Sequence, residues 1–145
     1  MKRTVFKGLK KFKKEFRQSF KSSFINYSET MGIRAEIVSE WEQYFEEYDL
    51  LVCPMSFGPA YKRCKIGSEL SYEGKSMIYS EYSWPYVTCF NASGHPAMNI
   101  PLGLNKNGLP VGVQIVSKYW SEPSMIHFAK LISQHIPGFV RPDGY

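Results

Sequence analysis

Residues 90–116 read FNASGHPAMNIPLGLNKNGLPVGVQIV, which places two apolar stretches on either side of Asn107-Gly108. Asn and Gly both tolerate the positive φ angles that a two-residue loop requires, so this pair predicts a tight β-hairpin. The first strand should cover residues 97–104, and the second should begin near Val111. Nearly all side chains in both strands are apolar, which is typical of strands buried on both faces inside a larger sheet.

The order of these motifs carries a family resemblance. An Asn-x-x-Gly-x-Pro-Ala turn at 91–97, a strand interrupted by Pro101, and Gly-Leu-Pro-Val-Gly-Val-Gln at 108–114 follow one another. This series resembles the C-terminal part of the amidase signature family, over about Asp49 to Gln134. The resemblance implies an α/β fold, namely part of a mixed β-sheet flanked by helices, here preceded by an N-terminal basic amphipathic helix.

Length and composition favour one partial domain over residues 1–145. The hydrophobic share of 43% and the aromatic share of 16% are typical of a folded chain and argue against disorder. No apolar run is long enough to cross a membrane, and charged residues rather than an apolar leader follow Met1. Cys53, Cys64 and Cys89 lie far apart without metal-ligand spacing, so we expect free thiols, a cytoplasmic location and no metal site.

The positive charge is concentrated at the N-terminus. Residues 1–21 contain nine Lys/Arg against Glu15 alone, whereas the whole chain carries a net charge of +5. At helical spacing, one apolar stripe forms here, so we predict a basic amphipathic helix over 1–25; its members are Val5, Leu9, Phe12, Phe16, Phe20 and Phe24. This helix could pack on protein or lie on an anionic membrane surface. No recognition motif accompanies the lysines, so we expect no nucleic-acid partner.

Further elements follow along the chain. We predict a helix over 30–48 that begins near Asn26 and Glu29, with its acidic outer face in solvent. Its apolar stripe comprises Ile33, Ile37, Trp41, Tyr44, Phe45 and Tyr48. A short buried strand should cover 49–54, and 56–80 should form a loop that borders a ligand site. A last helix should begin at Ser121 and end before Pro137, burying Ile126, Ala129, Ile132 and Ile136.

The family's chemistry implies functions that this sequence does not hold. The resemblance implies hydrolysis of a carboxamide by a serine that a second serine and a lysine activate, in a Gly-Gly-Ser-Ser-Gly-Gly loop. Ser22 and Ser23 are adjacent here but lack the glycines, so we assign no catalytic residue and no cofactor. A Ser93/His95/Asp49 set is a weak alternative because no nucleophile elbow is present, and we expect His95 to be a turn residue.

The resemblance does imply a substrate-pocket wall. Trp84, Thr88 one helical turn later, and Trp120 occupy positions that contact the substrate in relatives. Glutamine-using relatives carry an Asp where this chain has Trp84, so the resemblance implies an apolar amide substrate. The simpler alternative is that Trp84 and Trp120 are core aromatics.

Two functions remain open from the sequence. The chain is expected to be the C-terminal portion of a carboxamide hydrolase, either as a truncated product or as one piece of a split enzyme partnered by the N-terminal amidase portion. The alternative is a non-catalytic binding module that attaches to a membrane surface or a partner through its basic Phe-striped helix.

Overall fold

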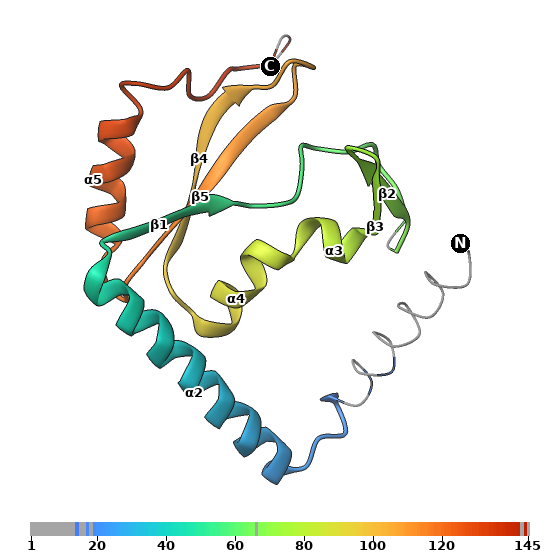
Figure 1. Cartoon of the computed structure of the whole chain (residues 1–145), viewed down its shortest axis with the longest axis vertical. Helices are drawn as coiled ribbons and strands as arrows, with labels where there is room; N and C mark the ends of the chain where they lie inside the picture. Colours follow the sequence, from blue (N-terminus) through green and yellow to red (C-terminus); the bar gives the residue numbers. More distant parts are fainter. Residues whose placement is uncertain (1–13, 15–16, 18, 66, 143, 145) are drawn as a thin grey trace.

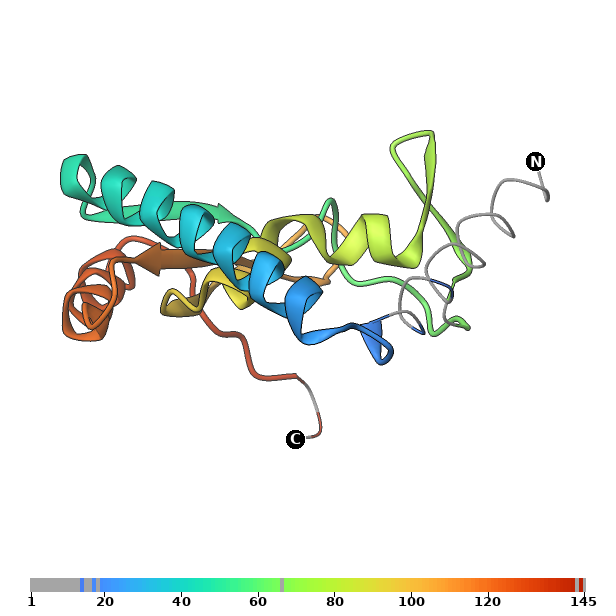
Figure 2. The ribbon, with the colours of Figure 1, turned by 90° about the horizontal axis from the view of Figure 1, so that it is seen from below.

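The computed structural model describes residues 14, 17, 19–65, 67–142 and 144. Three strands form one sheet in the order β1-β5-β4: β1 (Leu50–Pro54), β5 (Pro110–Ser117) and β4 (Ala97–Leu104). Helix α5 (Glu122–Ile132) lies on one side of this sheet, and α2 (Phe24–Glu47) and α4 (Pro85–Ser93) lie on the other (Figure 1 and Figure 2). The predicted α/β fold is therefore confirmed, and each strand pair among the described residues is antiparallel.

The core consists of two small clusters on opposite faces of the sheet. Ile115 packs with Ile100 and Met125 beneath α5, whereas Val116 packs with Phe45 and Phe90 beneath α2 and α4. Successive side chains of a strand point to opposite faces, so these two neighbours in β5 bury both sides of the sheet. Both have 0% exposure, as expected for a strand covered on both faces.

The hairpin end of the same sheet is uncovered. Val111 is 37% exposed in β5, and Val52 is 48% exposed in β1. The prediction of burial on both faces therefore holds at one end of β5 and is wrong at the other. The reason is that the helices of this chain cover only the end of the sheet that contains Ile115 and Val116.

The β4–β5 loop is longer than the predicted two residues. Asn105 N–H donates to Leu109 O over 2.9 Å, which leaves residues 106–108 as the loop. The Asn105 Oδ1 accepts from the N–H groups of Asn107 and Leu109, and Gly108 has a φ of +74°. Glycine alone thus adopts the left-handed conformation, and the Asn105 side chain closes the turn from within.

Helix α2 begins earlier than predicted. Ser23 is its N-cap, and the Ser23 Oγ accepts from Asn26 N–H over 3.2 Å. The predicted start near Asn26 and Glu29 is therefore wrong, because a serine three residues upstream provides the better cap. Most of the predicted basic helix over 1–25 lies outside the described residues. Its described end contains a turn at residues 20–21, and Phe24 already belongs to α2.

The predicted loop over 56–80 contains regular structure. Strands β2 (Glu69–Tyr72) and β3 (Lys75–Ile78) form an antiparallel hairpin, followed by helix α3 (Tyr79–Ser83). The two-residue turn between the strands is formed by Glu73 and Gly74, both with positive φ. Each strand has only four residues and is largely exposed, so the sequence offers little hydrophobic alternation to reveal it.

The last helix is close to its predicted position but presents a different face. Ser121 occupies the N-cap position as predicted, although its side chain makes no capping bond. Met125 is buried at 2% exposure, whereas Ile126 is 48% exposed. The prediction that Ile126 is buried is wrong, because the helix packs on Ile115 and Ile100 through Met125.

Candidate functional site

The two predicted pocket residues on α4 lie together. Trp84 immediately precedes the helix, and Pro85 occupies its first turn. The Thr88 Oγ1 donates to Trp84 O over 2.9 Å, which fixes the two residues one helical turn apart on an exposed surface. Trp84 is 37% exposed, and its ring meets Tyr79 edge-on at a centroid distance of 6.3 Å. Trp84 therefore projects from the domain instead of filling its core.

The third predicted residue lies elsewhere. Trp120 follows β5, has a φ of +63° and is 89% exposed. Its neighbour Tyr119 donates its hydroxyl to Ser93 O at the C-terminal end of α4, whereas Trp84 lies at the N-terminal end of that nine-residue helix. At 1.5 Å per residue, the helix separates the two by roughly 13 Å. The structure thus brings Trp84 and Thr88 together but not Trp120.

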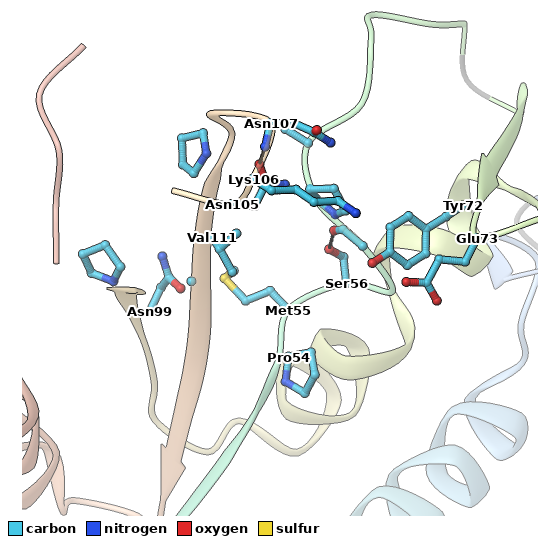
Figure 3. Close-up of a pocket in the computed structure, with 16 residues that line it drawn as sticks. Pro54, Met55, Ser56, Tyr72, Glu73, Asn99, Asn105, Lys106, Asn107 and Val111 are labelled. Carbon is cyan, nitrogen blue, oxygen red and sulfur yellow. Dashed lines mark hydrogen bonds between the residues drawn. The ribbon is translucent and has the colours of Figure 1, made fainter. Parts of the chain in front are cut away.

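An open pocket of about 810 Å³ lies at the uncovered hairpin end of the sheet (Figure 3). Its lining comes from the end of β1, the β4–β5 hairpin and the β2–β3 turn. Met55 and Val111 contribute apolar surface, and Lys106 points from the hairpin toward Tyr72 and Glu73. The full lining is Pro54, Met55, Ser56, Gly58, Pro59, Ala60, Tyr72, Glu73, Asn99, Pro101, Asn105, Lys106, Asn107, Pro110, Val111 and Gly112.

None of the three predicted site residues lines this pocket. The sequence signal for it was the position of residues 56–80 directly after a sheet strand, since such loops often border ligand sites. The opposite charges of Lys106 and Glu73 and the neighbouring amides suit a polar ligand over an apolar floor. Among the described residues, no group of His, Cys, Asp and Glu side chains is arranged to hold a metal ion.

A buried polar cluster joins α2 to the turn between α4 and β4. The His95 Nδ1 lies 2.9 Å from the Ser93 Oγ, and its Nε2 lies 3.1 Å from the Glu42 Oε1. Tyr119 N–H also donates to the Glu42 Oε1, over 3.2 Å, and the His95 ring stacks on Tyr119 at 4.4 Å. Arg34 adds two bonds to carbonyls at the end of α4.

This cluster corrects two predictions. His95 is 5% exposed and is not a surface turn residue, and Glu42 is a hydrogen-bond acceptor instead of part of a fully solvated face. Asp49 takes no part in it. The order serine, histidine, carboxylate is that of a nucleophile with its base, but Ser93 has 0% exposure. A substrate cannot reach its hydroxyl, so the cluster holds α2 against α4.

The described cysteines are all free thiols: Cys53, Cys64 and Cys89. Burial raises the pKa of the Cys89 thiol above its ordinary value. A raised pKa keeps the group protonated near neutral pH, and the thiol is a much weaker nucleophile than the thiolate. Cys53 accepts a hydrogen bond from the Gln114 Nε2 over 3.4 Å. We therefore assign Cys89 to packing against the sheet.

The comparison with known proteins decides the family. The family model described as Amidase matches residues 2–126, which is most of the chain. The chain belongs to the amidase family. The matched region begins well before Asp49, where the resemblance read from the sequence starts, and it includes the basic N-terminal segment and α2.

Similar curated members of the family are the A-type polypeptides of glutamyl-tRNA(Gln) amidotransferase. The one from Acinetobacter baylyi is 33% identical over 100 residues, which are 69% of this chain and 19% of that protein. The one from Thermodesulfovibrio yellowstonii is 31% identical over 111 residues, which are 77% and 22%. The chain thus spans about a fifth of the length of the curated relatives it matches.

Solved structures show the same fold. The 6-aminohexanoate cyclic dimer hydrolase superposes with a TM-score of 0.67 at 22% identity, over 83% of this chain and 26% of that chain. The A-type polypeptide of the Thermotoga maritima amidotransferase gives a TM-score of 0.50 at 20% identity, over 94% and 27%. Among the described residues, no helix combines the length and the apolar character needed to cross a membrane.

Proposed function

We propose that this chain forms the substrate-facing wall of a carboxamide hydrolase whose catalytic Ser-Ser-Lys residues lie in an amidase portion outside this sequence. The amidase match over residues 2–126 carries the proposal. The Gly-Gly-Ser-Ser-Gly-Gly loop is absent from the sequence. Residues 1–145 would be one partial domain of the enzyme, and the three free cysteines suit a cytoplasmic location.

The proposed substrate is an apolar amide. The exposure of Trp84 beside Thr88 supports contact with a ligand, since a core indole would be covered by its own domain. Trp120 is also exposed, so we assign it to contact with the substrate or with the remainder of the enzyme. An indole at Trp84 offers no partner for an ammonium group, which favours apolar amides over glutamine.

Sequencing upstream of Met1 tests the proposal directly. We expect an in-frame lysine followed by a glycine-rich Ser-Ser segment. Co-expression of that upstream region with this chain should yield amide hydrolysis and labelling of an upstream serine by a fluorophosphonate probe. An upstream region without these residues would contradict the proposal.

The chain by itself should not react with a fluorophosphonate. The probe requires an activated serine that it can reach, and the one serine hydrogen-bonded to a histidine, among the described residues, is the fully buried Ser93. Intact-protein mass spectrometry should show no added phosphonate under conditions that label a serine hydrolase completely. Stoichiometric labelling that Ser93→Ala abolishes would show that the chain has a catalytic site of its own.

The alternative of a binding module receives less support from the comparisons. The amidase match begins at residue 2, so the basic segment lies within the family region and is not an appended unit. Membrane attachment through this segment therefore becomes an outcome to be tested together with the surface described next.

A further inference from the structure

One side of α2 continues past the region where this helix packs on the domain. In its C-terminal half, Phe45 is buried against the sheet and Arg34 donates to carbonyls of α4. At 100° per residue, Phe24, Tyr27 and Met31 follow the same side toward the N-terminus. We call these three residues the α2 apolar stripe.

The α2 apolar stripe is exposed to solvent. Phe24 is 83% exposed, Tyr27 58% and Met31 38%. In Figure 1 the N-terminal end of α2 lies at the bottom of the view, away from the sheet and from α5. Single exposed apolar side chains are ordinary, but three on one side of a helix form a continuous patch of the kind that marks an interaction site.

We infer that the α2 apolar stripe is the docking surface for the amidase portion that lies outside this sequence. The inference rests on the proposed function. The stripe falls within the region matched by the family model, and the chain covers only about a fifth of its curated relatives. The stripe also prolongs the face through which α2 already packs on family structure, so a neighbouring part of the enzyme would extend that contact.

The charges of α2 favour a protein surface over a lipid surface. A helix that lies on an anionic membrane carries lysines and arginines on its polar face. The polar residues of α2 are instead acidic, with six glutamates against the single Arg34. An anionic head-group layer would repel this face, whereas an apolar protein surface contacts only the stripe.

The test uses the tagged full-length chain co-expressed with the polypeptide encoded directly upstream of Met1. Tyr27→Asp and Met31→Asp place a carboxylate in the stripe. Ile25→Asp is the matched control, because Ile25 is 68% exposed on a different side of the same helix turn. We expect each stripe variant to retain about tenfold less upstream polypeptide, or less, than wild type after affinity purification, and the control to retain as much as wild type.

The outcomes separate the two proposals. Co-purification of the wild-type pair that both stripe variants leave unchanged would overturn the docking surface and leave the proposed function standing. Failure of the wild-type pair to associate would count against the proposed function itself. In a second arm the chain is sedimented with phosphatidylserine vesicles. Salt-sensitive binding that Tyr27→Asp abolishes and Ile25→Asp preserves would assign the stripe to a membrane and overturn the inference.

Discussion

Expressed alone, the chain should aggregate or bind hydrophobic dyes, and it should show no sharp, cooperative thermal transition. Its accessible surface is 11546 Å², whereas a compact monomer of 16.8 kDa exposes about 7,700 Å². The open end of the sheet exposes Val52 and Val111. Since β1 and β4 are both edge strands, each also presents unpaired backbone groups to other chains.

Dye fluorescence, light scattering and calorimetry on the purified chain would check this result. Co-expression with the upstream amidase portion is the control, and it should restore a soluble species with a cooperative melt. A monomeric chain that melts sharply on its own would show that these two small clusters suffice as a core. It would then favour a self-contained domain over a piece of a larger enzyme.

In the complete enzyme, Trp84→Asp should reverse the preference between apolar and amino-acid amides. Burying an unpaired ammonium against an indole costs several kcal/mol, and the new carboxylate would supply the missing partner. An apolar substrate would lose contact worth about 25 cal/mol per Å². We expect the ratio of kcat/KM values for apolar over amino-acid amides to fall by about a hundredfold, which corresponds to about 2.7 kcal/mol.

Steady-state kinetics on a matched pair of amides would measure this ratio. Trp84→Phe is the control, because it keeps an apolar aromatic ring and should change the ratio little. Substitution of Thr88 should act in the same direction as Trp84→Asp but less strongly, since Thr88 lies one turn further along α4. An unchanged ranking of substrates in Trp84→Ala would show that Trp84 takes no part in the pocket.

Local signals in the sequence were sufficient for much of the fold. Ser121 and Pro123 marked the start of α5, and the apolar run after Asp49 marked β1. The four-residue spacing of Trp84 and Thr88 placed them on one side of a helix. These features depend on residues a few positions apart, where backbone preferences and helical or strand periodicity act directly.

The sequence was weaker where one local preference competed with another. Asn107-Gly108 indicated a two-residue loop, but the side chain of Asn105 stabilised a longer one. The β2–β3 hairpin was missed because its four-residue strands are mostly exposed and lack an apolar period.

Only the tertiary structure decided which distant residues meet. Glu42 and His95 are hydrogen-bonded across 53 positions of sequence, and no periodicity within α2 distinguishes Glu42 from the solvated glutamates beside it. Trp120 could be placed with Trp84 only by analogy, and the length of α4 keeps them at opposite ends of that helix. Contacts of this kind depend on how the helices pack on the sheet, because packing sets the distance between side chains that the chain itself leaves free to vary.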